Sequence, residues 1–110
     1  LNSALTVKES YVTTNGNEVT NVNQNNLMMS GYTVRLKLVF NLINANNDYH
    51  EVLIGTIPEN YRPRTEEVFF YSDGSGTLLT FSVMPNGSIL MYPSTIYGAN
   101  TRAILSGTYI

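Results

Sequence analysis

The sequence predicts an all-β domain, and three observations support this prediction. Apolar and polar residues alternate along several segments, most clearly between residues 32 and 43. Turn residues separate these segments at intervals of about 8 to 12 residues, as they do in sandwiches and barrels. No segment shows the period of roughly 3.6 residues that marks an amphipathic helix. We therefore expect a compact antiparallel β-sandwich or β-barrel of about eight strands.

The individual strands follow from the alternation. In residues 32–43 every second residue is apolar, which predicts a long, half-buried strand. Residues 24–30 are ambiguous, because they fit either a short strand or an apolar plug. The expected core face of the long strand consists of Tyr32, Val34, Leu36, Leu38, Phe40 and Leu42. The expected strands span residues 4–14, 17–23, 32–43, 49–57, 66–72, 77–84, 87–92 and 102–110.

Turn residues connect the expected strands. The Asn15-Gly16 pair favours a two-residue hairpin between residues 4–14 and 17–23, because Asn and Gly tolerate the positive φ that such turns require. Residues 73–76 (Asp-Gly-Ser-Gly) and residues 85–87 (Pro-Asn-Gly) predict two further hairpins. Residues 44–48 form a polar loop after the long strand.

The long strand also bears on oligomeric state. Val39 and Ile43 lie on the face opposite its main apolar set. Packing between copies can bury such a second face, and closed rotational symmetry is the usual result. We therefore expect a homotrimer.

Composition limits the function classes. The 110 residues predict one domain spanning 1–110, and the first residue, Leu1, suggests a domain cut from a longer protein. No cysteine is present, so disulfides and thiolate metal sites are excluded. The net charge is −2 and the six Lys and Arg residues are scattered, so we expect no nucleic-acid partner. The sequence contains no apolar run long enough to span a membrane and no recognisable signal peptide, so we expect neither membrane insertion nor export.

Catalytic and metal-binding patterns are absent from the sequence. His50 is the single histidine, and no serine lies in a nucleophile motif. Glu66 and Glu67 are adjacent in an expected strand, so they point to opposite faces and cannot serve one glycosidase site. Asp48 and His50 could face one ion, but two ligands are too few for a metal site. We expect no enzyme, no cofactor and no metal.

Saccharide recognition fits the polar composition better. Fourteen Asn and twelve Thr residues offer uncharged hydrogen-bonding groups, and eight tyrosines supply rings while tryptophan is absent. The alternative is that loop tyrosines anchor loops to the sheet, and that the arginines pair with Glu59 or Glu66. The expected saccharide-binding residues are Asp48, Tyr49 and His50, followed by Tyr61, Arg62 and Arg64.

One segment carries a family resemblance. Residues 55–63 read Gly-Thr-Ile-Pro-Glu-Asn-Tyr-Arg-Pro, and the two prolines exclude a helix across it. This segment resembles one in the C-terminal head domains of bacteriophage tail and baseplate receptor-binding proteins, especially those of siphophages that infect Gram-positive hosts. Pro85-Asn86-Gly87-Ser88-Ile89 and the terminal Gly107-Thr108-Tyr109-Ile110 extend the resemblance over residues 30–110.

The resemblance implies a homotrimeric head at the tail tip or baseplate of a virion, made in the host cytoplasm. It implies binding of host cell-wall polysaccharide without catalysis, and contact with other tail or baseplate proteins through a missing N-terminal part. Sugar sites in lactococcal phage heads combine an aromatic ring with Arg, Asp and His, and here a tyrosine would supply the ring. Two alternatives stay open: a structural trimerisation or capping module without a ligand, and a small glycan hydrolase.

Overall fold

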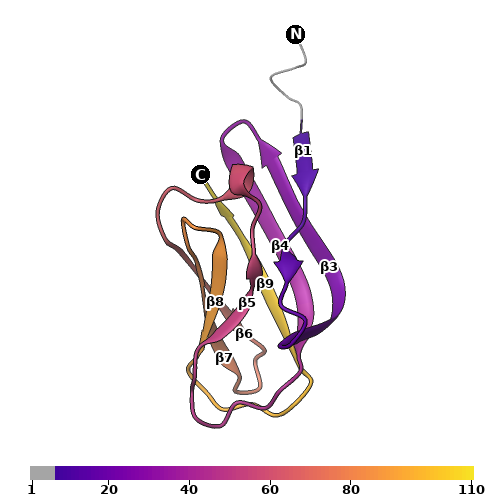
Figure 1. Cartoon of the computed structure of the whole chain (residues 1–110). Helices are drawn as coiled ribbons and strands as arrows, with labels where there is room; N and C mark the ends of the chain where they lie inside the picture. The colour runs from indigo at the N-terminus through magenta and orange to yellow at the C-terminus, as the bar shows by residue number, and fades with distance from the viewer. Residues whose placement is uncertain (1–6) are drawn as a thin grey trace.

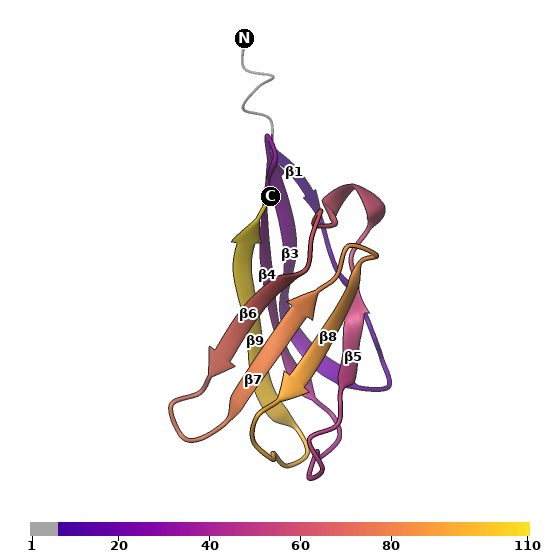
Figure 2. The same ribbon diagram turned by 90° about the vertical axis from the view of Figure 1, so that its left-hand side faces the viewer.

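The computed structural model describes residues 7–110 as a sandwich of two antiparallel sheets (Figures 1 and 2). The predicted all-β class is confirmed, and the sheets form a sandwich rather than a barrel. The strand order is β1-β3-β4-β9 in the four-stranded sheet and β2-β5-β8-β7-β6 in the five-stranded sheet. The strands are β1 (Val7–Ser10), β2 (Thr13–Thr14), β3 (Val19–Ser30), β4 (Thr33–Leu42), β5 (Val52–Thr56), β6 (Glu67–Ser72), β7 (Leu78–Val83), β8 (Ser88–Pro93) and β9 (Thr101–Tyr109).

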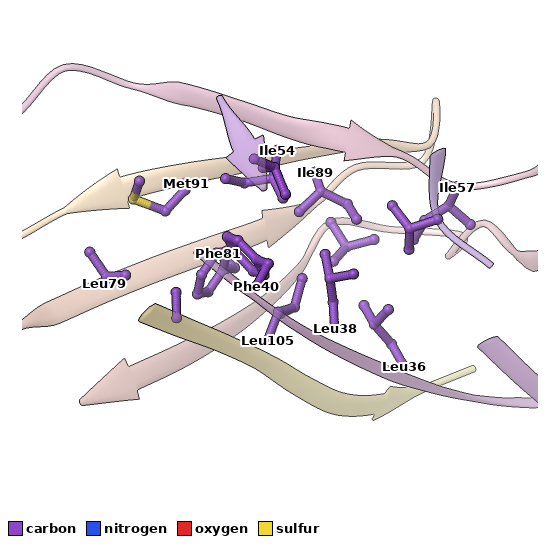
Figure 3. Packing of buried hydrophobic residues seen from close by; sticks show 14 of the residues in the cluster. Leu36, Leu38, Phe40, Ile54, Ile57, Leu79, Phe81, Ile89, Met91 and Leu105 are labelled. Carbon is purple, nitrogen blue, oxygen red and sulfur yellow. The ribbon is translucent and has the colours of Figure 1, made fainter. Parts of the chain in front are cut away.

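The core lies between the two sheets, where side chains of β4 and β9 meet those of β5, β7 and β8 (Figure 3). The predicted core face of the long strand is confirmed from Val34 to Leu42, whereas Tyr32 is exposed. Phe40 and Phe81 are fully buried and meet edge to face, with ring centroids 6.2 Å apart and an interplanar angle of 77°. Burying each ring stabilises the fold by about 1.5–3 kcal/mol.

The predicted Asn15-Gly16 hairpin is wrong. Residues 13–14 pair with β5 in the five-stranded sheet, whereas β3 lies in the four-stranded sheet. Asn15 is tied to β5, because its backbone N–H donates to the Ile54 carbonyl (2.8 Å) and its side chain donates to the Leu53 carbonyl (2.9 Å). The turn therefore crosses between the sheets instead of pairing its two flanking strands.

The N-terminal strand boundaries also differ from the prediction. The predicted strand 4–14 begins outside the described residues and is divided into β1 and β2, which belong to different sheets. The ambiguous residues 24–30 continue residues 19–23 as one strand, β3. A bulge between Thr20 and Gln24, with Asn21 at φ 50°, shifts the register along that strand.

The hairpins predicted at residues 73–76 and 85–87 are confirmed. The first joins β6 to β7, and the Asp73 carboxylate accepts the N–H groups of Ser75 (2.8 Å) and Thr77 (3.1 Å). The second joins β7 to β8, and the Gly87 N–H donates to the Met84 carbonyl (2.9 Å). Gly87 has φ 94°, a conformation that glycine adopts without strain.

Val39 does not need a partner subunit for its burial. It is only 4% exposed in the single chain. Gln24 of β3 and Ile104 of β9 lie directly opposite it in the ladder, so neighbours on the same face shield it. The sequence-based reason for expecting a homotrimer is therefore wrong for this residue, and Ile43 is half-buried as well.

Candidate functional site

The residues expected to bind saccharide lie at two opposite ends of the sandwich. Residues 48–50 precede β5, whereas residues 61–64 follow it. A strand of five residues places its two ends roughly 17 Å apart, since each residue rises by about 3.3 Å. The two groups therefore cannot form one site, and Figure 1 shows their loops at the bottom and the top of the molecule. We call residues 43–51 with 94–100 the histidine end, and residues 31–32, 57–66 and 84–87 the arginine end.

Asn46 holds the histidine end together. Its backbone exchanges two hydrogen bonds with Tyr97, at 3.0 and 3.1 Å. Its side-chain amide donates to the His50 carbonyl (2.9 Å) and accepts the His50 N–H (3.2 Å). Because Asn46 is buried, these bonds satisfy polar groups that have lost water, and they fix the loop against residues 94–100.

The histidine end presents three of the expected residues to solvent. The His50 Nδ1 lies in hydrogen-bond contact with the Asp48 carboxylate, and this bond lowers the pKa of Asp48 below its usual value. Tyr49 lies between them with φ 61°, and its ring is 58% exposed. Within residues 7–110, no three His, Asp or Glu side chains come together to hold a metal ion.

Tyr61 anchors the arginine end. Its side chain is 8% exposed and belongs to the core, so its ring offers no open face for stacking on a sugar. Its carbonyl accepts a hydrogen bond from the buried Tyr109 hydroxyl at 2.5 Å. Burial raises the pKa of Tyr109, and the nearby Glu67 charge adds to the effect. The hydroxyl therefore stays protonated and keeps the bond over the whole physiological range.

Hydrogen bonds also hold the connection between β5 and β6, residues 57–66. The short 3₁₀ turn η2 (Glu59–Tyr61) follows Pro58, whose carbonyl accepts the Tyr61 N–H at 2.9 Å. The Ile57 N–H donates to the Gly87 carbonyl at 2.8 Å and ties the connection to the β7–β8 turn. As the two prolines predicted, no α-helix crosses residues 55–63.

Arg62 lies in a fixed position against this turn. Its Nε donates to the Ile57 carbonyl at 2.9 Å. A Cβ at position 87 would lie 2.5 Å from that Nε, so the side chain can occupy this place only because residue 87 is glycine. One N–H of the guanidinium is used in this bond, and the terminal nitrogens keep their donors for another partner.

The salt bridges expected as the alternative role of the arginines do not form. Among residues 7–110, the single ion pair joins Asp48 and His50. Neither Arg62 nor Arg64 has a carboxylate of the described residues within pairing distance, although Glu59 and Glu66 are near in sequence. Neither guanidinium group therefore belongs to an ion pair within residues 7–110.

Both arginines line the same shallow pocket of about 150 Å³. The exposed Tyr32 ring and the Asn60 amide contribute to the same walls. The pocket thus combines a flat ring, an amide and two cations, a set of groups that can hold a hydroxylated or anionic ligand. Its lining residues are Met29, Gly31, Tyr32, Val34, Asn60, Arg62, Arg64 and Ile110.

Sequence reasoning missed Tyr32 and Asn60 as pocket residues. Alternation places Tyr32 on the core face of the long strand, but it lies in a two-residue turn closed by the Ser30–Thr33 pair. Gly31, with φ 61°, precedes it in that turn. The Ser30-Gly31 dipeptide is a turn signal and could have revealed the hairpin. Asn60 has no such signal, because its place in the pocket depends on how the connection folds against β4.

No protein-family model matches this chain, and a search of curated proteins found no significant similarity. Residues 7–110 include no helix with the length and hydropathy needed to cross a bilayer. The family resemblance of residues 55–63 therefore stays a prediction.

Proposed function

We propose that this chain is a saccharide-binding head domain of a bacteriophage tail or baseplate, and that the pocket at the arginine end is its binding site. One observation carries the proposal: two arginines that have no carboxylate partner within residues 7–110 share a pocket with an exposed tyrosine ring and an amide. A pyranose stacks on such a ring, and the guanidinium forks bind its vicinal hydroxyls or an attached phosphate or carboxylate.

Preorganisation supports this proposal. The connection that carries Arg62 is held by five hydrogen bonds, two donated by Arg62 and one each by Ile57, Tyr61 and Tyr109. A side chain that is already fixed loses little conformational entropy when a ligand binds. Rigidity alone would also serve a purely structural loop, but the absence of a carboxylate partner for either arginine within residues 7–110 favours a ligand.

The size of the pocket predicts a small epitope and weak single sites. A volume of about 150 Å³ is below the roughly 300 Å³ of sites for drug-sized ligands, so it accommodates one ring or one charged substituent. A homotrimer with three such pockets would gain avidity of about 10² to 10⁴ over one site. Single sites near the millimolar range could then still hold a particle on its host.

The pocket favours binding over hydrolysis. Its lining residues include no Asp or Glu, whereas glycoside hydrolysis requires a pair of carboxyl groups about 5 to 9.5 Å apart. A structural trimerisation or capping module without a ligand is the second candidate, and the exposed apolar side chains on the outer face of the five-stranded sheet, such as Phe70, favour it.

Titration with purified cell-wall polysaccharides of Gram-positive bacteria tests the proposal. Arg64→Ala and Tyr32→Ala should each weaken binding at least tenfold, because each removes a pocket group that holds no other part of the fold. Arg102→Ala is the matched control, since it removes an exposed arginine on β9 far from the pocket. Circular dichroism should show all three variants folded. Equal binding by wild type, Arg64→Ala and Tyr32→Ala would overturn the assignment of this pocket.

A further inference from the structure

Every charged side chain that lines the pocket at the arginine end is a cation. Arg62 and Arg64 contribute the two charges, and the lining includes no Asp or Glu. No carboxylate of residues 7–110, the terminal one of Ile110 included, lies within 4.0 Å of either guanidinium. A concave surface with charges of one sign attracts ligands of the opposite sign, so the pocket favours a negatively charged group.

The hydrogen-bonding groups of the pocket are mostly donors. A guanidinium carries N–H donors and no acceptor, so both arginines can only donate. Among the lining side chains, the amide oxygen of Asn60 and the hydroxyl of Tyr32 are the strong acceptors. A sugar hydroxyl needs an acceptor for its proton, whereas a phosphate or carboxylate oxygen only accepts. An oxyanion therefore matches this set of groups better than neutral hydroxyls do.

Arg62 presents its terminal nitrogens from a fixed position. Its Nε is used by the bond to the Ile57 carbonyl, and the guanidinium occupies space that a side chain at Gly87 would fill. A planar guanidinium can bind two oxygens of one carboxylate or phosphate, and such charge-assisted bonds are roughly twice as strong as neutral ones. Because Arg62 is already ordered, it would lose little conformational entropy when it holds an anion.

Arg64 can supply a second set of donors to the same group. It lies two residues further along the connection and lines the same pocket. It is exposed and belongs to no ion pair within residues 7–110, so it can turn toward a ligand without breaking one. Since both guanidinium groups reach water, salt should weaken their attraction for an anion.

We propose that the pocket binds the anionic oxygens of a charged saccharide, on a phosphate or a carboxylate group, rather than the hydroxyls of a neutral sugar. This inference names the ligand class of the proposed function and rests on it. Arg62 and Arg64 hold the anion, and the Tyr32 ring, which is 82% exposed, contacts the sugar that carries it. The pocket volume of about 150 Å³ suits such a substituent, with the rest of the sugar outside.

NMR titration with matched monosaccharides tests the inference. Glucose, glucuronate and glucose 6-phosphate share one pyranose ring and differ in bearing a hydroxyl, a carboxylate or a phosphate on the last carbon. At least one anion should bind about tenfold more tightly than glucose, shift the amide signals of Asn60 and Arg64, and lose affinity as salt is raised. The tighter anion identifies the source of the charge. Glucose binding as tightly as the anions, or no binding of either anion at millimolar concentrations, would overturn the inference.

Matched variants show whether the arginines recognise the charge. Arg64→Gln keeps a polar side chain that donates and accepts hydrogen bonds but removes the cation. It should reduce the preference for the anion over glucose by about fivefold or more. Arg102→Gln is the control, because this exposed arginine lies on β9, roughly 23 Å along the strand from Tyr109. Both variants change the net charge equally, so a difference between them is local. An unchanged preference in Arg64→Gln would contradict the proposed role.

Two wall polysaccharides distinguish failure of this inference from failure of the proposed function. One polymer is neutral, and the other carries phosphate or uronic acid. A response of the pocket signals to the charged polymer alone supports the inference. Equal responses, or a response to the neutral polymer alone, would refute it and leave saccharide binding intact. A response to neither polymer would refute the proposed function and this inference together.

Discussion

The two ends of the sandwich both present polar and aromatic residues, but they are held together in different ways. The arginine end depends on packing: the Tyr61 ring belongs to the core, and Arg62 lies over Gly87. The histidine end depends on one buried amide, Asn46, which joins two loops by hydrogen bonds. The first arrangement fixes Arg62 without an ion pair among residues 7–110, whereas the second pairs Asp48 with His50 at the surface.

This difference shows that exposed charge alone does not identify a binding site. The Asp48–His50 pair satisfies itself, so it has less to gain from a ligand than two unpaired arginines in a pocket. A fixed position and an unsatisfied charge together make the arginine end the better candidate.

Replacing one tyrosine at each end should give the largest difference in the free energy of unfolding. Tyr61→Ala should lower the free energy of unfolding by about 3–5 kcal/mol, because it removes a buried ring and leaves a cavity. Tyr49→Ala, at the histidine end, should change it by less than about 0.5 kcal/mol, because its ring is exposed. Urea unfolding measures both. Similar losses for the two variants would show that packing does not distinguish the ends.

Replacing a glycine at each end should give an intermediate difference in the free energy of unfolding. Gly87→Ala should cost about 1–3 kcal/mol, because alanine at φ 94° is strained and its Cβ would displace Arg62. Gly98→Ala at the histidine end should cost nothing measurable, since no atom lies within 4 Å of the position that an added Cβ would take. Thermal unfolding gives the stabilities, and polysaccharide titration should show weaker binding only for Gly87→Ala.

Alkaline pH should weaken the arginine end through Tyr109. Its pKa is raised in the folded protein above the usual value of 10.0, so folding favours the neutral hydroxyl. The resulting stability is complete below about pH 10 and is lost as the pH rises toward the higher folded-state pKa. Tyr109→Phe should lose about 1 kcal/mol at pH 7, because it removes the bond to the Tyr61 carbonyl, and it should show a smaller decline above pH 10. Urea titrations at neutral and alkaline pH measure both effects, and an unchanged alkaline decline would contradict this role of Tyr109.

The smallest effect is expected at the histidine end. His50→Ala should return the pKa of Asp48 toward its ordinary value of 3.8, since the hydrogen bond from His50 is the main cause of its lowering. The free energy of unfolding should stay constant because both side chains are exposed. NMR titration of the carboxyl carbons measures this change. Asp73 is the internal control, because backbone N–H groups of Ser75 and Thr77 lower its pKa independently of His50.

Elements that depend on neighbours along the chain were predictable from the sequence. Alternation located the core face of β4, since side chains of a strand point to opposite faces whatever sheet it joins. The turns at residues 73–76 and 85–87 were predictable because their residues satisfy local backbone requirements. The placement of Arg62 and Arg64 in one short connection after Pro58 was also local, but the predicted grouping of these arginines with residues 48–50 was not, and the two sets lie at opposite ends of β5.

Contacts between residues distant in sequence set which strands share a sheet and which loops lie at the same end. The Asn15-Gly16 turn has hairpin chemistry, yet its flanking strands find partners in different sheets through contacts distant in sequence. Tyr32 joins the arginines because the β3–β4 turn and the 57–66 connection meet at one end, while residues 48–50 lie at the other end of β5. Such proximity follows from sheet pairing and register, which are fixed by the packing of the whole core rather than by any local pattern.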